Sequence, residues 1–154
     1  MEEKTYLTKE GYERLKLELE NLLNKERKTV AERIKTAKQH GDLSENSEYS
    51  DAKEQQSFLE GRIIELEHIL KNADIIEDQH NDCKEVGMGC TVDLKTAAKD
   101  LQYKIVGSVE ANPDKGYISN ESPIGKALMG KKTGDAVEVS VPAGVTKYIV
   151  TKIC

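Results

Sequence analysis

The sequence predicts an α+β protein with an N-terminal antiparallel coiled-coil helical hairpin, residues 1–75, and a small antiparallel sheet domain with a packed helix, residues 76–154. Three observations predict this division. Apolar residues in the first half recur at helical spacing, whereas the second half holds short alternating β-branched runs between turn residues. Of the 154 residues, 33% are charged and only 37% hydrophobic, which is too polar for one large core.

The first helix is expected to begin at Thr8, a residue type that caps helix N-termini, and to end at Gly41. Its apolar positions follow a three-four rhythm that lapses only around Glu26 and Arg27. These positions are Tyr12, Leu15, Leu19, Leu22, Leu23, Val30, Ile34 and Ala37. One face of this helix is therefore predicted to pack against a partner.

The second helix supplies that partner, because its apolar positions alternate strictly between spacings of three and four. They are Tyr49, Ala52, Gln56, Leu59, Ile63, Leu66, Leu70 and Ala73, with one polar layer at Gln56. Facing residues of an antiparallel pair have numbers with a constant sum. Ala37 with Ala52, Val30 with Leu59, Leu23 with Leu66 and Leu19 with Leu70 all give 89. The turn is therefore predicted to centre on Ser44, with Lys38 and Lys53 level with each other just behind it.

The segment around this turn, QHGDLSENSEYSDAKEQ over residues 39–55, is strongly acidic. Asp42 and Glu45 could offer hard oxygen ligands to a divalent cation, but two carboxylates hold Mg²⁺ weakly unless other ligands come from elsewhere. The alternative is structural. Asp42 and Glu45 have the spacing of a capping box, the other acids would favour a helix N-terminus, and Lys38 and Lys53 would be solvated charges.

The second half is predicted to form several strands and one short helix. The runs GCTVDL, LQYKIVGS, DAVEVSVP and TKYIVTKI are predicted strands, and ADIIED is a further candidate at the junction. Ser122 and Pro123 stand in the N-cap and N1 order of a helix start, and Gly130 is its expected end. These elements predict a small sheet with a helix packed on it.

Composition excludes several classes of protein. A formal net charge of −5 argues against unaided binding to duplex nucleic acid and favours a protein partner. Cys83, Cys90 and Cys154 form no C-x-x-C pair, so we expect inert thiols in a reducing cytoplasm. The three histidines are scattered, which argues against a metal site. No apolar run approaches a membrane span and no signal peptide is expected.

Three segments carry a resemblance to a known family. They are HGDLSENSEYSDAKEQQSFLEGRIIELE, YLTKEGYERLKLEL before it and YKIVGSVEANPDKGYISNESPIGKALMGKKTGD after it. All three resemble the corresponding segments of the bacterial Gre transcript-cleavage factors. The resemblance implies a coiled-coil hairpin that enters the secondary channel of RNA polymerase and an FKBP-like domain that docks outside. The acidic net charge and the lack of a large basic patch on the hairpin favour the GreA branch over the GreB branch.

The resemblance also implies roles for individual residues. Asp42 and Glu45 would hold a second Mg²⁺ only together with the polymerase active site, which cleaves the 3′ end of backtracked RNA. The factor would thus be no enzyme alone, and no bound metal is expected in the isolated protein. Lys38 and Lys53 would contact the RNA, where the family usually has arginine at one or both positions. Ser122, Pro123, Ile124 and Lys126 would dock on the coiled coil of the largest subunit, although Gly125-Lys126 replaces the usual Ala-Arg. We expect a cytoplasmic monomer.

Two other functions stay open. A non-cleaving regulator would occupy the same channel and only block nucleotide entry; retention of both acids speaks against it. A prolyl isomerase or chaperone is suggested by an FKBP-like fold alone, which is weak support for function. Isomerase pockets of that type are lined with aromatic residues. This chain has no Trp, its one Phe is Phe58 on the hairpin, and its second half offers only Tyr103, Tyr117 and Tyr148.

Overall fold

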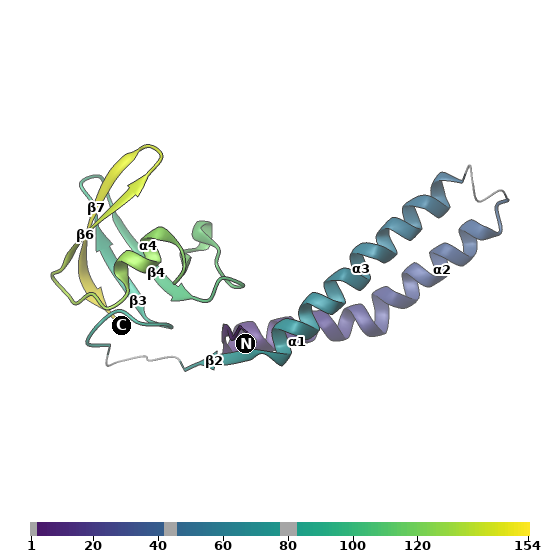
Figure 1. Ribbon diagram of the computed structural model, residues 1–154, viewed down its shortest axis with the longest axis horizontal. Helices are drawn as coiled ribbons and strands as arrows, with labels where there is room; N and C mark the ends of the chain where they lie inside the picture. The colour runs from purple at the N-terminus through teal and green to yellow at the C-terminus, as the bar shows by residue number, and fades with distance from the viewer. Residues whose placement is uncertain (1–2, 42–45, 78–82) are drawn as a thin grey trace. The chain divides into compact units, whose positions relative to one another are not determined.

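The computed structural model describes residues 3–41, 46–77 and 83–154 (Figure 1). Two compact units emerge. One is the helical unit, residues 12–72, and the other is the sheet unit, which joins residues 1–11 to residues 73–154. The first strand of the chain thus packs with the C-terminal half. The predicted division of domains at residues 75 and 76 stays a prediction.

The helical unit is the predicted hairpin. Its elements are α1 Lys9–Asn21, a π-helical turn Leu22–Glu26, α2 Arg27–Lys38 and α3 Ser47–Lys71. α2 and α3 run side by side in Figure 1, and their seam is apolar. The buried core of this seam is Val30, Ile34, Ala52, Leu59 and Ile63, flanked by Leu19, Leu22, Leu23 and Tyr49. All nine are positions that the three-four rhythm predicts.

The π-helical turn lies where the apolar rhythm lapses. A π turn holds one more residue per turn than an α-helix, so it moves the apolar face around the helix axis. The lapse at Glu26 and Arg27 was therefore a sign of this turn, although periodicity alone predicted one continuous helix.

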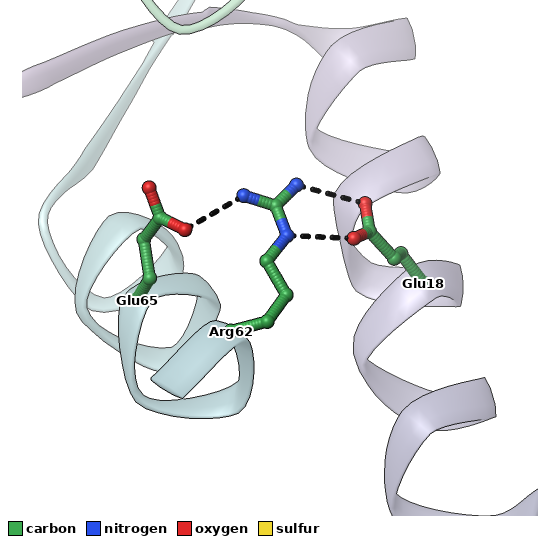
Figure 2. Close-up of polar contacts among 3 residues, drawn as sticks. All are labelled: Glu18, Arg62 and Glu65. Carbon is green, nitrogen blue, oxygen red and sulfur yellow. Dashed lines mark hydrogen bonds and ion pairs between the residues drawn. The ribbon is translucent and has the colours of Figure 1, made fainter. Parts of the chain in front are cut away.

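Polar side chains join the two arms outside the apolar seam. The guanidinium of Arg62 on α3 donates from Nε to Oε1 of Glu18 on α1 at 2.8 Å and from Nη2 to Oε2 at 3.1 Å. A third bond reaches Glu65 at 2.8 Å, as Figure 2 shows. These bonds raise the pKa of Arg62 and keep it charged. Arg27 likewise donates to Glu60 through Nε and Nη2, at 2.8 Å each.

The sheet unit holds two sheets. Strands β1 and β2 pair in parallel, and the larger sheet has the strand order β5-β4-β3-β7-β6. Helix α4 lies beside this sheet (Figure 1). Its residues Ile124, Ala127 and Leu128 belong to or pack against the sheet's apolar core. The elements are β1 Thr5–Thr8, β2 Ala73–Ile76, β3 Thr91–Lys95, β4 Asp100–Val106, β5 Tyr117–Ser119, α4 Pro123–Leu128, β6 Ala136–Val141 and β7 Gly144–Ile153.

The α+β class and four predicted C-terminal strands are confirmed, and ADIIED does contain a strand, β2. One detail differs from the prediction of an antiparallel sheet. β5 pairs with β4 in parallel, from Lys104 opposite Tyr117 to Val106 opposite Ser119. The connection between them includes a short 3-10 turn, Pro113–Lys115, and brings the chain back to run in the same direction.

The prediction of three unpaired thiols was wrong. Cys83 and Cys90 form a disulfide, and only Cys154 is free. The spacing of seven residues gives no motif, but a turn brings the two ends together: the amide of Cys90 donates to the carbonyl of Gly87, and Gly89 has a φ of 83°. Such a φ is accessible to glycine at little cost.

None of the helices within the described ranges is long and apolar enough to cross a membrane.

Candidate functional site

The predicted catalytic residues, Asp42 and Glu45, lie outside the described residues, and so does Ser44, the predicted centre of the turn. The structure does describe the two helix ends that flank this segment. α2 ends at Lys38, and Gly41 follows with a φ of 115°. α3 begins at Ser47. The structure therefore describes both helix ends that flank the acidic segment.

Asn46 joins these two helix ends. Its side-chain oxygen accepts a hydrogen bond from the amide of Tyr49 at 3.2 Å, which makes it the N-cap of α3. Its side-chain nitrogen donates to the carbonyl of Ala37, near the end of α2, at 2.7 Å. One side chain thus satisfies a free donor of α3 and a free acceptor of α2. Asn46 is therefore the N-cap of α3, and the capping alternative for Asp42 and Glu45 lies outside the described residues.

Sequence reasoning missed Asn46, although a signal was present. Asn is among the preferred N-cap residues, and it directly precedes the apolar-periodic segment.

We expect Asn46→Ala to destabilise the helical unit by about 2 kcal/mol, from a lost cap of about 1 kcal/mol and a lost hydrogen bond of similar size. Asn46→Asp is the matched variant, since a carboxylate can cap α3 but cannot donate to the carbonyl of Ala37. It should lower the free energy of unfolding by about half as much as Asn46→Ala. Urea unfolding followed by helical circular dichroism measures both. Equal stability of Asn46→Ala and the unmodified chain would contradict the role of Asn46.

The two predicted RNA-contacting lysines are exposed and flank the acidic turn. Lys38 is the last residue of α2, and Lys53 lies in the second turn of α3. Each directly follows a buried alanine of the seam, Ala37 or Ala52. Lys53 donates to Oε1 of Gln56 at 3.0 Å. Both ammonium groups are thus accessible to a phosphate that approaches the end of the hairpin.

The predicted docking segment, residues 122–126, forms the start of α4. The Ser122 hydroxyl accepts from the amide of Gly125 at 3.1 Å and donates to the carbonyl of Ser119 at 2.6 Å, which confirms it as the N-cap. Pro123 and Lys126 are exposed. Ile124 is half-buried and packs on the core, so it has a structural role as well.

Three residues of this segment, Ser122, Pro123 and Ile124, line one open cleft of about 310 Å³ in the sheet unit. The rest of its lining is mainly apolar and includes the rings of Tyr103 and Tyr148. Burial, and then the neighbouring Tyr148, raise the pKa of Tyr103 above its ordinary value. The cleft can therefore receive an apolar side chain of a partner, with Lys126 exposed on the same helix.

Comparison with known proteins decides the family. A model described as "Transcription elongation factor, N-terminal" matches residues 5–75, and one described as "Transcription elongation factor, GreA/GreB, C-term" matches residues 80–154. The chain belongs to the GreA/GreB family of transcription elongation factors. The first match spans the helical unit together with β1 and most of β2, and the second spans the five-stranded sheet and α4.

Relatives point to the GreA branch of this family. Proteins named transcription elongation factor GreA from Caldanaerobacter subterraneus subsp. tengcongensis and Thermoanaerobacter pseudethanolicus are each 50% identical over 155 residues, with 99% of both chains covered. Among solved structures, GreA factor homolog 1 (Gfh1) of Thermus thermophilus is 31% identical, with 99% of both chains covered and a TM-score of 0.46. The two GreA relatives and the family match make the chain a GreA-like transcription elongation factor.

Within residues 3–41, 46–77 and 83–154, no three His, Cys, Asp or Glu side chains group so that they could hold a metal ion. The predicted ligands Asp42 and Glu45 fall in the gap between the first two ranges.

Proposed function

We propose that this GreA-like factor acts on bacterial RNA polymerase in the cytoplasm and stimulates the polymerase's own cleavage of the 3′ end of backtracked RNA. The match to GreA proteins over the whole chain carries the proposal, since both modules of the family are present. The factor is an accessory protein rather than a nuclease by itself. Its partners are the polymerase and the extruded RNA, and it binds as a monomer.

In this proposal, Asp42 and Glu45 are the catalytic residues. The match to the family's N-terminal module, which spans both acids, supports this assignment. Carboxylate oxygens are the ligands that Mg²⁺ prefers, and two of them hold it only together with ligands from elsewhere. The second Mg²⁺ of a two-metal site would activate water and share the charge of the transition state. Asp42 and Glu45 would bind and orient it only inside the polymerase.

Lys38 and Lys53 are proposed to steady the phosphates of the extruded RNA. Both are exposed and stand beside the acidic turn on opposite arms. A lysine offers a compact charge without the two-pronged geometry of the arginine that the family usually has at one or both positions. The contact is therefore expected to be electrostatic and sensitive to salt.

The sheet unit is proposed to dock on the coiled coil of the largest polymerase subunit, outside the secondary channel. The cleft beside Ser122, Pro123 and Ile124 supports this, since it offers an apolar recess next to an exposed lysine. Docking would hold the factor on the polymerase while the hairpin enters the channel.

The test is to add the protein to a halted, backtracked polymerase complex that carries end-labelled RNA and Mg²⁺. New short RNAs are expected with both components present and none when the protein and RNA are mixed without polymerase. If the factor binds and slows transcription without new fragments, it is a non-cleaving channel regulator. Degradation by the protein alone that co-purifies with it would also refute the proposal.

A further inference from the structure

A disulfide in the sheet unit ties together the two ends of one short loop. Cys83 and Cys90 are separated by seven positions of sequence, and both belong to the sheet unit. Cys90 is 1% exposed, whereas Cys83, at the other end of the loop, is half-buried. One end of the bond is therefore sealed in the core, and the other belongs to a residue that solvent reaches.

The loop that this disulfide closes is packed into the core of the sheet unit. Val86 is 2% exposed and belongs to the same apolar cluster as Leu128 of α4. The amide of Gly89 donates to the carbonyl of Ile105 on β4 at 2.8 Å, and the amide of Ile105 donates back to the carbonyl of Cys90 at 3.0 Å. The loop is thus fixed to β4 at its Cys90 end.

Backbone hydrogen bonds also join this loop to the end of α4. The amide of Val86 donates to the carbonyl of Lys131 at 2.8 Å, and its carbonyl accepts from the amide of Gly130, also at 2.8 Å. The amide of Lys131 donates in turn to the carbonyl of Leu128 at 3.0 Å. Because α4 spans only Pro123–Leu128, the helix that carries the proposed docking segment is held at its C-terminal end by the disulfide-closed loop.

We propose that the Cys83–Cys90 disulfide is a redox switch for polymerase docking. The intact bond holds the loop, and through Val86 the end of α4, in place, whereas reduction leaves both free to open locally. The inference rests on the proposed function, which places this factor in the cytoplasm and its docking segment on α4. Disulfides are rare in that compartment, and those that occur there are usually transient and catalytic or redox-sensing.

Reduction needs a thiol electron donor of the kind that keeps a cytoplasm reducing. A donor thiolate attacks the sulfur of Cys83, because access decides which sulfur is attacked, and the electrons of the S–S bond leave on the sulfur of Cys90, which takes up a proton. A second donor thiolate attacks the donor sulfur of this mixed disulfide and releases Cys83, which is protonated in turn. Two electrons and two protons pass to the protein, and two donor thiols become one disulfide.

The first test needs no polymerase, so it separates failure of this inference from failure of the proposed function. The full chain is oxidised with diamide or reduced with dithiothreitol, and its thiols are counted with a maleimide in urea. We expect one thiol in the oxidised chain and three in the reduced chain. Reduction should lower the melting temperature by about 5–10 °C and speed hydrogen exchange of the Val86 and Gly130 amides about tenfold, because the loop is no longer cross-linked.

Two variants sharpen this test. Cys83→Ser cannot form the disulfide and keeps the buried Cys90, so its amides should exchange like those of the reduced chain under both conditions. Cys154→Ser is the matched control, since Cys154 is the free cysteine and lies outside the loop, and it should respond to oxidation and reduction like the unmodified chain. Three thiols in the oxidised unmodified chain, or equal exchange of the Val86 and Gly130 amides in both states, would refute the switch.

The second test measures docking. Oxidised and reduced factor, freed of reagent, are each titrated against a backtracked polymerase complex. We expect reduction to raise the half-saturating concentration about fivefold with the maximal rate unchanged, because apparent affinity falls with the fraction of molecules in the docking-competent conformation. Cys83→Ser should titrate like the reduced factor after either treatment. Equal half-saturation of the two forms of the unmodified factor, despite altered exchange at Val86 and Gly130, would overturn the link to docking.

Discussion

Asp42→Asn and Glu45→Gln are each expected to lower the maximal rate of polymerase-dependent transcript cleavage by about 10²–10³-fold. Loss of one preorganised electrostatic partner commonly has an effect of this size. The amide variants keep the shape of the side chain but lose the anionic ligand that Mg²⁺ prefers. The rate is measured at saturating factor on a backtracked complex with end-labelled RNA. Added Mg²⁺ should restore part of it by filling the weakened site.

Stability and binding are the controls for these two variants. Because Asn46 caps α3, neither substitution removes the cap, and each should change the free energy of unfolding by no more than about 0.5 kcal/mol. Competition for polymerase should be almost unaffected. Near-normal cleavage by both variants would mean that the acids are not metal ligands and that the factor works mainly by occupying the channel.

Lys126→Glu is expected to weaken docking on the polymerase and to leave the maximal cleavage rate unchanged. The residue is exposed on α4, whose first turn lines the apolar cleft, so reversal of its charge opposes docking without disturbing the core. We expect the half-saturating concentration to rise about tenfold while the maximal rate is kept, because charges at an interface rim act mainly on association. A titration of cleavage rate against factor concentration measures both quantities.

Lys152→Glu is the matched control, since Lys152 is also exposed in the sheet unit but lies on β7, outside the proposed docking segment 122–126. It should titrate like the unmodified factor. If Lys126→Glu and Lys152→Glu titrate alike, then residues 122–126 are not the docking segment, and the polymerase contact must be sought on another face of the sheet unit.

Local patterns predicted those parts of the fold that depend on neighbours in sequence. The spacing from Val30 to Ala37 and from Ala52 to Ile63 identified the buried seam, because helical periodicity places those residues on one face. Ser122 and Pro123 identified the start of α4 for a similar reason, since capping is a local interaction.

Contacts between distant residues were not predictable in the same way. β1 has four residues, too few for a periodic signal, and its partner β2 begins at Ala73. The bond of Glu110 to Thr8 and the disulfide of Cys83 with Cys90 depend on how loops return, which composition and spacing do not encode. Thr8 itself was predicted as a cap, but the carboxylate that holds it was not.

The sequence pattern of the acidic segment is compatible with two roles for Asp42 and Glu45, as helix-capping residues or as metal ligands. The structure assigns the cap of α3 to Asn46, whose side-chain amide donates to the carbonyl of Ala37 and accepts from the amide of Tyr49. Asp42 and Glu45 themselves lie outside the described residues. Metal binding by Asp42 and Glu45 concerns chemistry inside RNA polymerase, so it requires an assay with polymerase.

The central claim, that chemistry lies in the hairpin turn and docking in the sheet unit, is tested most directly by one titration. The unmodified factor, Asp42→Asn and Lys126→Glu are titrated against the same preparation of backtracked polymerase, and the maximal rate and half-saturating concentration of cleavage are measured for each. We expect Asp42→Asn to lower the maximal rate alone and Lys126→Glu to lower the affinity alone. If the two variants change the same quantity, or if excess Asp42→Asn restores full cleavage, the claim is contradicted.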